Sequence, residues 1–291
     1  MIPRSFDYSA PNTLEEAVSL LKTLGPDAKV LSGGQSLIPM MKLRLASPPH
    51  IVDINRIPGL DYIVEIDGSL RIGALVRESD LESSILVKSR LPILVDTTSV
   101  IADPLVRNQA TVCGNLAHGD PANDHPATML ALGASMLAVG PGGEREIPVG
   151  SFFPGLFTTA LQPDEILKEI RIPIPPPSSG GAYLKLERKV GDYATAGVAA
   201  QISLDRSGAC ARAGIGLTNV GFTPIKARNA EAFLVGKALD EATIRQASEL
   251  AAGESQPVDD IRGSAAYKKD LVRVLAARAI NLALTRARGG A

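Results

Sequence analysis

The sequence contains few of the residues that bind metal ions or iron–sulfur clusters. Its 291 residues include only 2 cysteines and 3 histidines. Cys113 and Cys210 lie far apart in the chain and form no CxxC pair. So few thiolates and imidazoles cannot hold an iron–sulfur cluster or a structural zinc ion.

Long apolar runs and an excess of one charge are also missing. No apolar segment reaches the length needed to cross a membrane, and the N-terminal residues MIPRSFDYSAP lack the apolar core of a signal peptide. The 30 basic and 31 acidic residues give a formal net charge of −1. This balance gives no reason to expect nucleic acid or an anionic membrane as a partner, and we predict a cytoplasmic location.

Several common catalytic motifs are absent too. No Walker loop and no complete GxGxxG fingerprint is present, and the nearest match, GIGLTN at 214–219, lacks the third glycine. These absences disfavour an ordinary ATPase or an NAD-dependent dehydrogenase. The sequence also has no GxSxG motif and no evident pair of nucleophile and base.

The first part of the chain is predicted to form a small α/β unit. Apolar residues recur at helical spacing over 13–24, where NTLEE provides an N-cap and acidic residues, and Gly25-Pro26 ends the helix. Short buried strands are expected within AKVLSGG at 28–34 and HIVDI at 50–54.

An antiparallel middle region is predicted next. Two alternating apolar runs flank Asp67-Gly68, which is a strong signal for a β-hairpin. A helix is expected over about 78–88 and another from Pro92, followed by an irregular segment at 106–126 and a short helix at 127–134. A second hairpin is expected to turn at 141–143, before one more strand in DEILKEIRIPI.

The stretch PPPSSGG at 175–181 is the clearest boundary, because stiff prolines precede flexible glycines. Three strands are expected beyond it, then three helices at about 224–236, 240–252 and 264–287. The predicted fold class is therefore α+β. It comprises a small α/β unit at 1–55, an antiparallel middle domain at 56–177, and a C-terminal three-stranded sheet with a helix bundle at 178–291.

Two glycine-bearing loops are the candidate binding elements. In KVLSGGQS at 29–36, a strand runs into two glycines, so that successive N–H groups and the Ser36 hydroxyl could approach one phosphate. A tight turn is the alternative. Thr111, Gly114 and Asn115 form a second small-polar loop. Two such loops could clamp a diphosphate from both sides, whereas one alone would bind it weakly.

A metal site is the rival interpretation of the segment that follows the second loop. His118, Asp120, Asp124 and His125 lie close together in the sequence, as in some metallophosphatase loops. Two-metal hydrolases need several more ligands, and only His50 remains as a third histidine, so the metal site is disfavoured. Loop-capping aspartates and a surface histidine are favoured instead.

Three segments together resemble the FAD-binding medium subunit of molybdenum hydroxylases, in the xanthine dehydrogenase family. They are SGGQSLIPMMK, TVCGN…GDPANDHPA and KLERKVGDYATA. The likeness is greatest to the medium subunits of aerobic carbon monoxide dehydrogenases, and it continues in order from IPRSFDY through IRIPIPPP and IGLTNV. The resemblance implies an FAD-binding fold of the vanillyl-alcohol-oxidase/PCMH type in the first two units, followed by a C-terminal flavoprotein domain.

The resemblance also implies cofactor-binding residues in both loops and elsewhere. The loops would hold the FAD pyrophosphate and neighbouring groups through Lys29, Val30, Leu31, Ser32, Gly33, Gly34, Gln35 and Ser36, and through Thr111, Val112, Cys113, Gly114 and Asn115. Asp124 would make a polar contact with FAD, and the flavin site would be lined by Ile101, Leu161 and Lys185, with Tyr193 over one flavin face. The alternatives are a solvated strand lysine for Lys185 and a half-buried strand tyrosine for Tyr193.

One departure from the family pattern concerns the second loop. The family usually has Thr-Ile-Gly-Gly there, whereas this chain has Thr111-Val112-Cys113-Gly114. Cys113 adds a side chain where the backbone should approach phosphate, so its φ must suit a residue other than glycine. We expect the Cys113 side chain to point away from the ligand and to be a buried filler, with a reactive thiol as the alternative.

The function implied by the resemblance is electron transfer through FAD in a heteromeric oxidoreductase, with no catalytic residue in this chain. Partner subunits, in a dimer of heterotrimers, would carry the molybdenum cofactor and the [2Fe–2S] clusters. Electrons would leave to an external acceptor such as a quinone, and the complex could associate with the inner face of the membrane. Its substrate would be carbon monoxide, or else an N-heterocycle, a purine or an aldehyde. A flavin-free scaffold and a metal-dependent phosphohydrolase are the alternatives of other classes.

The last predicted helix is rich in basic residues. It contains one acid, Asp270, and six bases, Lys268, Lys269, Arg273, Arg278, Arg286 and Arg288. An acidic partner could dock there, although a solvated helix face is the favoured interpretation.

Overall fold

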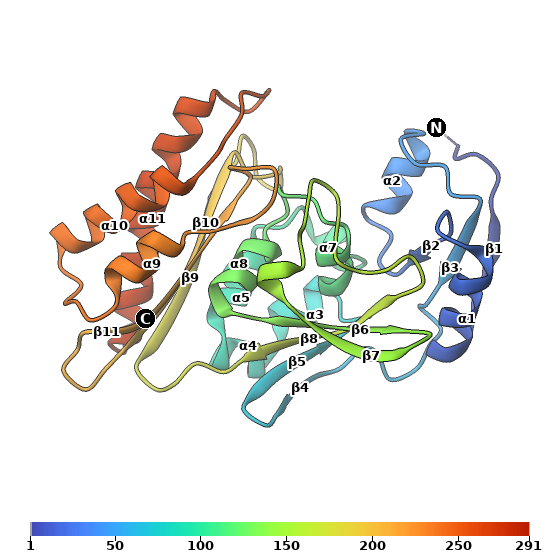
Figure 1. Ribbon diagram of the computed structural model, residues 1–291, viewed down its shortest axis with the longest axis horizontal. Helices are drawn as coiled ribbons and strands as arrows, with labels where there is room; N and C mark the ends of the chain where they lie inside the picture. Colours follow the sequence, from blue (N-terminus) through green and yellow to red (C-terminus); the bar gives the residue numbers. More distant parts are fainter. Residues whose placement is uncertain (1, 291) are drawn as a thin grey trace.

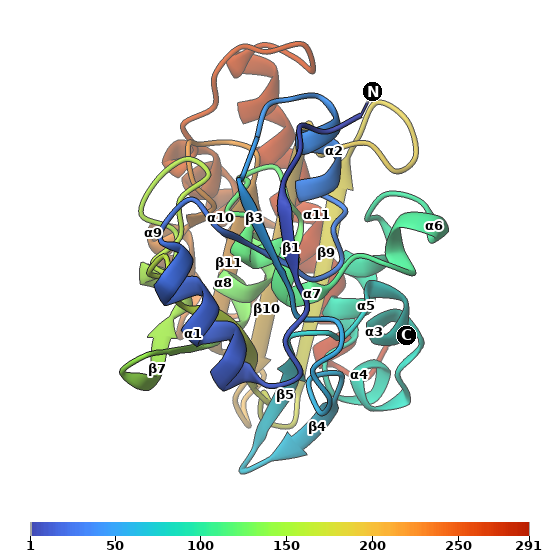
Figure 2. The ribbon, with the colours of Figure 1, turned by 90° about the vertical axis from the view of Figure 1, so that its right-hand side faces the viewer.

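Three β-sheets, each with its own helices, follow one another along the computed structural model, which describes residues 2–290 (Figure 1). The middle sheet lies between the N-terminal and C-terminal sheets. Figure 2 views the same row from the N-terminal end, with α1 (Leu14–Leu24) and β1 (Asp7–Ser9) toward the viewer. Each sheet uses strands from only one of the segments 1–55, 56–177 and 178–291, and the division into separate folding units stays a prediction.

The N-terminal sheet is parallel, in the order β1-β3-β2, with β2 at Lys29–Leu31 and β3 at His50–Asp53. The Thr13 side chain caps α1 by accepting a hydrogen bond from the Glu16 N–H, as the sequence predicts. A second helix, α2 (Leu37–Lys42), starts directly after the first glycine loop. Residues 32–36 therefore lie at the carboxyl end of a parallel strand, where ligands commonly bind in α/β units.

The middle sheet is antiparallel, in the order β4-β5-β8-β6-β7. Its strands are β4 (Ile63–Ile66), β5 (Ser69–Gly73), β6 (Ser135–Gly140), β7 (Gly143–Pro148) and β8 (Ile166–Pro173), and a short 3-10 helix, η1 (Val149–Ser151), follows β7. Asp67 and Gly68 both have positive φ, of 51° and 71°, as a tight hairpin turn requires. Both predicted hairpins are confirmed.

The helices of the middle region correct two predictions. They are α3 (Glu78–Ser83), α4 (Ile85–Arg90), α5 (Pro92–Ser99), α6 (Pro104–Arg107), α7 (Val112–Ala117) and α8 (His125–Leu132). A single helix over 78–88 is wrong, because Ser84 ends α3 and its side chain caps α4 by accepting from the Val87 N–H. An irregular 106–126 is also wrong, because Thr111 caps α7 and this helix buries Val112 and Leu116.

The C-terminal sheet has four strands in the order β12-β11-β10-β9, one more than predicted. They are β9 (Ser179–Leu186), β10 (Ala196–Leu204), β11 (Cys210–Thr218) and the two-residue β12 (Ile225–Lys226). The helices α9 (Arg228–Leu234), α10 (Glu241–Glu254) and α11 (Ala265–Ala287) cover one face, and α5 and α8 contact the other (Figure 1). Helices from the middle region therefore pack directly on the C-terminal sheet.

The GIGLTN segment is explained by this packing. A Cβ on Gly214 would lie 1.9 Å from the Ala131 carbonyl oxygen, and one on Gly216 would lie 1.9 Å from the Ala127 carbonyl oxygen. Both glycines belong to β11, and both carbonyls belong to α8. The two glycines therefore allow α8 to lie close against β11, which is a structural role unrelated to nucleotide binding.

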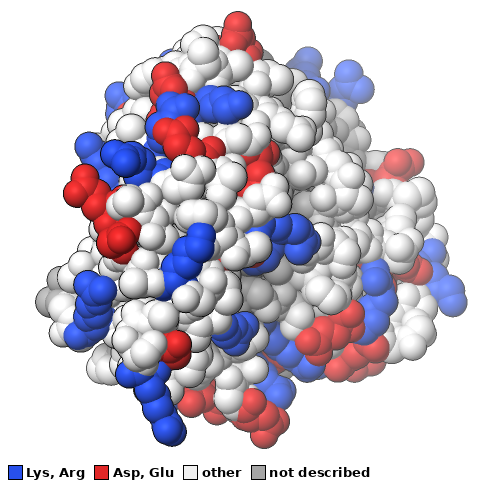
Figure 3. Space-filling view, turned by 60° about the vertical axis from the view of Figure 1, so that its left-hand side comes forward, with Lys and Arg blue, Asp and Glu red and all other residues white. Residues whose placement is uncertain are grey.

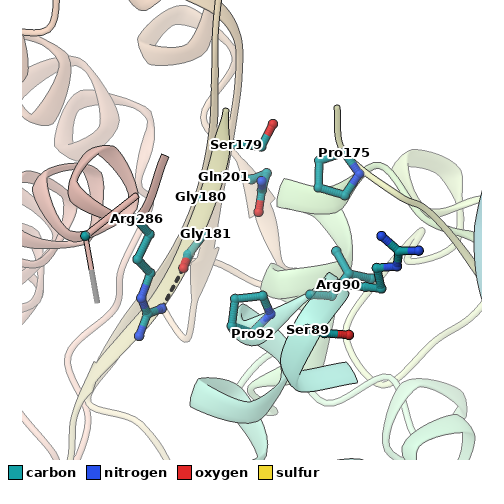
Figure 4. A pocket seen from close by; sticks show the side chains of 11 residues that line it. Ser89, Arg90, Pro92, Pro175, Ser179, Gly180, Gly181, Gln201 and Arg286 are labelled. Atoms are coloured by element: carbon teal, nitrogen blue, oxygen red, sulfur yellow. Dashed lines mark hydrogen bonds between the residues drawn. The ribbon is translucent and has the colours of Figure 1, made fainter. Parts of the chain in front are cut away.

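The end of α11 is tied to the middle region by Arg286. Its Nη1 donates to Asp96 Oδ2 on α5 at 2.5 Å. It also donates to the Gly181 carbonyl oxygen on β9 at 2.6 Å (Figure 4). A small cavity of about 310 Å³ lies beside this contact, lined also by Pro92 and Gln201. This cavity lies between α5, β9 and α11, away from both glycine loops.

The basic residues of α11 are partly neutralised within the chain. The Lys268 side chain is 2% exposed and pairs with Asp260 at 2.6 Å, while Arg273 pairs with Glu249 at 2.7 Å and also with Asp270. With Arg286, three of the six bases are thus engaged in ion pairs. Figure 3 shows acidic and basic side chains interspersed on the side of the molecule that it presents.

Candidate functional site

A cleft of about 1130 Å³ is bordered by the N-terminal unit, the middle region and the loop after β9. Both glycine loops line it, and so do the residues that the resemblance places around the flavin. Every predicted site residue borders the cleft except Val112. The structure therefore brings into one site residues that range from position 29 to position 193.

The first loop presents a row of free backbone donors. Among residues 2–290, no protein acceptor is hydrogen-bonded to the N–H of Gly33, Gly34, Gln35 or Ser36. Gly34 has φ +74°, a left-handed conformation that favours glycine. Successive N–H groups of this kind form a concave anion-binding surface.

Gly33 is required for a reason that the sequence does not reveal. A Cβ there would lie 2.4 Å from the Gln109 carbonyl oxygen and 2.8 Å from the Ala110 Cα. Both atoms belong to the main chain that leads into the second loop, which cannot move aside easily. Gly33 therefore permits close contact between the two loops, in addition to any approach of a ligand.

The second loop is fixed by its own cap and by the first loop. Thr111 Oγ1 accepts a hydrogen bond from the Gly114 N–H at 3.2 Å, which starts α7. The same oxygen lies 3.0 Å from Ser32 Oγ, so the hydroxyls of the two loops are hydrogen-bonded to each other. These contacts leave the loops preassembled as two walls of one cleft.

Val112 and Cys113 point into the core. Val112 is fully buried and its N–H donates to the Val76 carbonyl, so the prediction that it lines the site is not supported by the cleft's composition. Cys113 borders the cleft, but its thiol contacts the Ile72 and Gly73 carbonyls at 3.8 and 3.7 Å. Burial raises the pKa of this thiol, which makes it a poor nucleophile. The expectation of a buried filler is confirmed, although Cys113 lies in the first turn of α7 and not in an irregular loop.

The walls of the cleft also contain an unsatisfied acceptor. Asn115 Oδ1 is buried and has no hydrogen-bond partner among the described residues, and its main-chain oxygen accepts from Asn123 Nδ2 at 2.8 Å. Buried polar atoms are normally paired, so a donor on a ligand or water is expected there. The free N–H groups of residues 33–36, the Asn115 Oδ1 acceptor and the volume of the cleft together fit a dinucleotide joined by a diphosphate.

Lys185 is buried, and the alternative of a solvated strand lysine is wrong. Its Nζ donates to the Val100 carbonyl at 2.6 Å, the Asp192 carbonyl at 3.1 Å and Asp124 Oδ2 at 3.2 Å. The Lys185 side chain is 1% exposed. All three N–H donors of the Lys185 ammonium group are bonded to protein oxygens. Lys185 therefore connects the loops around the site and has no free donor for a ligand.

Asp124 is equally committed to protein partners. Its Oδ1 accepts from the Tyr183 hydroxyl at 2.5 Å, while its Oδ2 accepts from Lys185. Burial raises the pKa of this carboxyl, and Lys185 and the Tyr183 hydroxyl oppose that shift. Tyr183, Asp124 and Lys185 therefore form a buried hydrogen-bonded network at the wall of the cleft.

Tyr193 stands at the edge of the cleft and is 45% exposed. Its N–H donates to Asp192 Oδ1, and that carboxylate also accepts from Arg262 Nη2 at 3.1 Å and from Arg188. Burial alone would raise the pKa of Asp192, but these hydrogen bonds lower it to about 2. The Arg262 guanidinium lies 5.5 Å from the Tyr193 ring centroid, so the turn that precedes α11 also orients this aromatic.

The metal hypothesis fails on geometry. Within residues 2–290, no group of three or more His, Cys, Asp or Glu side chains is arranged to hold a metal ion. His125 is buried against Glu78, with His125 Nε2 2.8 Å from Glu78 Oε2, and Asp124 is bonded to Tyr183 and Lys185. The His118 ring instead packs beside the Phe157 ring, with 5.5 Å between the two ring centroids.

Sequence reasoning missed several residues around the site. His118, Asn123 and Phe157 border the cleft, and two residues behind the loops, Asn55 and Arg77, connect them by hydrogen bonds. His118 and Asn123 lie beside the second loop in a segment already singled out. Asn55 and Arg77 had no local signal, because their partners are distant in the sequence.

Two family models match the chain in succession. Residues 4–175 match the FAD binding domain in molybdopterin dehydrogenase, and residues 181–283 match the CO dehydrogenase flavoprotein C-terminal domain. Among the described residues, no helix is both long and apolar enough to cross a membrane.

Relatives of known name align with nearly the whole chain. The carbon monoxide dehydrogenase medium chain of Hydrogenophaga pseudoflava is 45% identical over 98% of this chain and 99% of its own length. Subunit alpha of the 6-hydroxypseudooxynicotine dehydrogenase complex of Paenarthrobacter nicotinovorans is 39% identical over 99% of this chain and 97% of its own length. A structure of carbon monoxide dehydrogenase from Hydrogenophaga pseudoflava superposes with a TM-score of 0.96, at 46% identity, over 98% of this chain and 99% of that one.

Proposed function

The chain belongs to the FAD-binding medium subunits of molybdenum hydroxylases, and from this premise we propose that it serves a carbon monoxide dehydrogenase complex. The observation that carries FAD binding is the contact between Ser32 and Thr111, which joins the two glycine loops at one cleft, beside four N–H groups that have no protein acceptor among residues 2–290. We propose that these loops hold the FAD pyrophosphate.

The residues of this chain bind and orient the cofactor and perform no acid–base step. FAD, when bound, exchanges electrons singly or in pairs. The N–H groups of residues 33–36 supply neutral donors to the diphosphate, and Asn115 Oδ1 supplies an acceptor. Tyr193, Ile101 and Leu161 provide apolar surface for the ring, and the buried Asp124–Lys185 pair fixes the surrounding loops.

We further propose that partner subunits carry the molybdenum cofactor and the [2Fe–2S] clusters. The iron–sulfur subunit would deliver electrons to this subunit, and a quinone or another external acceptor would remove them. We propose that the complex is a dimer of heterotrimers. We propose that it lies in the cytoplasm, where it can contact the inner face of the membrane. Similarity to medium chains of multi-subunit enzymes supports the large and small partners.

Carbon monoxide is the substrate that we propose for the complex. It is favoured over an N-heterocycle because identity to the carbon monoxide dehydrogenase medium chain, at 45%, exceeds the 39% to the 6-hydroxypseudooxynicotine dehydrogenase subunit. Substrate activation would occur in the molybdenum subunit, so the difference between the two sequence identities supports carbon monoxide only through the partner with which this chain assembles.

The test is purification of the tagged chain from its native host together with its partners. We expect a yellow complex with about one FAD per copy of this chain, which oxidises carbon monoxide in the presence of a quinone or dye. Oxidation of an N-heterocycle, purine or aldehyde in its place would reassign the substrate. A colourless complex would favour the flavin-free scaffold.

A further inference from the structure

We propose that Arg77 and Asn55 are positioning residues that set the distance between the two glycine loops. This inference rests on the proposed function, because it concerns how the loops hold the FAD pyrophosphate. Neither residue borders the cleft. Each acts on the cofactor site only through the main-chain oxygens of the loops.

On the side of the second loop, the main chain of Arg77 is held by its neighbours. The Glu78 N–H donates to the Ala110 carbonyl at 2.9 Å, and the Val112 N–H donates to the Val76 carbonyl at 3.1 Å. The Arg77 side chain then returns to the same segment, where Nη1 donates to the Gln109 carbonyl at 2.5 Å. That carbonyl oxygen is the nearest atom to the place that a Cβ on Gly33 would occupy, so Arg77 fixes the main chain against which the first loop lies.

On the side of the first loop, Asn55 continues the connection. Arg77 Nη2 donates to Asn55 Oδ1 at 2.7 Å, and Asn55 Nδ2 donates to the Ser32 carbonyl at 2.8 Å. Ser32 immediately precedes Gly33. One path of three hydrogen bonds thus runs from the Gln109 carbonyl, just before the second loop, to the Ser32 carbonyl of the first loop.

Asn55 is itself held in place by the N-terminal sheet. Asp53 Oδ1 accepts from the Asn55 N–H at 2.8 Å and from Asn55 Nδ2 at 2.6 Å. The other oxygen, Asp53 Oδ2, accepts from the Tyr8 hydroxyl at 2.7 Å. The amide therefore has one orientation, with its oxygen toward Arg77 and its nitrogen toward Ser32.

The residue types suit this task. The guanidinium is a planar fork whose two terminal nitrogens reach two acceptors in fixed directions, which a lysine ammonium cannot reproduce. An asparagine amide accepts and donates at the same time. Among residues 2–290, the Arg77 guanidinium donates to two neutral oxygens, those of the Gln109 carbonyl and the Asn55 amide, so its role is geometric.

The test uses the complex purified with its partners, stripped of flavin, and titrated with FAD and separately with ADP. ADP contains the diphosphate but no flavin ring. We expect Arg77→Lys and Asn55→Ala each to weaken FAD and ADP binding by the same factor, roughly tenfold or more. At saturating FAD, the visible spectrum should equal that of the wild type, because the ring environment is unchanged. The double variant should be little weaker than either single variant.

Arg171→Lys is the matched control. Arg171 also joins two partners, Glu169 Oε1 at 2.6 Å and Glu146 Oε2 at 2.7 Å, but it lies on β8. The Arg171→Lys variant should leave the dissociation constants of FAD and of ADP unchanged. Arg77→Lys with wild-type affinity, or with loss of FAD but not ADP, would overturn the inference. Should that variant fail to fold, Asn55→Ala gives the same comparison. A wild-type complex that binds neither ligand would refute the proposed function before any variant is compared.

Discussion

The hydroxyl of Ser32 lies 3.0 Å from the hydroxyl of Thr111, and this contact joins loops that are 79 residues apart. One hydroxyl follows β2 of the N-terminal sheet, and the other stands at the start of α7. Because the loops contact each other directly, the cleft between them is already formed in the protein alone. A preformed site lowers the entropy cost of holding a long, flexible dinucleotide.

Gly33→Ala is expected to weaken FAD binding roughly tenfold or more, because forced overpacking costs about 1–3 kcal/mol. The added Cβ would lie 2.4 Å from the Gln109 carbonyl oxygen and would push the loops apart. Flavin titration of the stripped complex measures the effect. Gly142→Ala, where a Cβ meets no atom within 4 Å, should bind FAD normally. Equal affinity of the Gly33 variant would show that the loops tolerate separation.

Lys185→Met is expected to lower the free energy of unfolding by about 3–5 kcal/mol, the usual cost of removing one partner of a buried ion pair. It would leave the Asp124 carboxylate and two carbonyls without their donor. Urea unfolding monitored by circular dichroism gives the value. Lys189→Met, in the same segment but exposed, should change stability by less than about 0.5 kcal/mol. Similar values for both variants would contradict the buried network.

Asp192 should make stability depend on acid pH. Its pKa of about 2 in the folded protein lies below the ordinary value of 3.8, so its stabilising contribution is complete above about pH 4 and disappears as pH falls towards 2. The stability difference between wild type and Asp192→Asn should therefore be constant from pH 7 to 5 and shrink below pH 4. Urea midpoints at several pH values test this, with Asp61→Asn, at an exposed position, as the control. A difference that stays constant down to pH 2.5 would count against the Arg262 and Arg188 contacts as its cause.

Tyr193→Leu is expected to weaken FAD binding about threefold to tenfold, because an aromatic pair contributes about 0.5–1.5 kcal/mol beyond its area. The flavin fluorescence should also rise, since a nearby tyrosine ring would no longer quench it. Tyr193→Phe keeps the ring and should bind FAD as the wild type does, but its flavin fluorescence should rise as in the leucine variant, because a phenyl ring is too hard to oxidise to quench the flavin. Loss of binding in the phenylalanine variant would instead assign the role to the hydroxyl.

Local patterns predicted the elements whose signals are carried by neighbouring residues. The capped helix over 14–24, the hairpin at Asp67-Gly68 and the strand before the first glycine loop all follow from spacing, caps and turn residues. The break at Ser84 was missed, because one hydroxyl cap decides between one helix and two. The short helix α7 was missed because its glycine and asparagine disguise a turn that buries Val112 and Leu116.

The role of individual glycines was decided by distant partners. Gly33 looked like a site of ligand approach, and the structure shows that it also faces the Gln109 carbonyl. Gly214 and Gly216 belong to an incomplete fingerprint that the sequence already disfavoured, and the structure shows that they face carbonyls of α8. The sequence could not assign these roles, because the atoms that face the three glycines are distant in the chain.

The sequence by itself determined the α+β class, the two glycine loops and the family likeness, because these depend on residue order and on local backbone preferences. Only the tertiary structure decided that the loops touch, that Lys185 is buried, and that Arg77 and Asn55 connect the loops from behind. Those features depend on atoms far apart in the chain, and hydrogen bonds over a few ångströms form only after packing has brought them together.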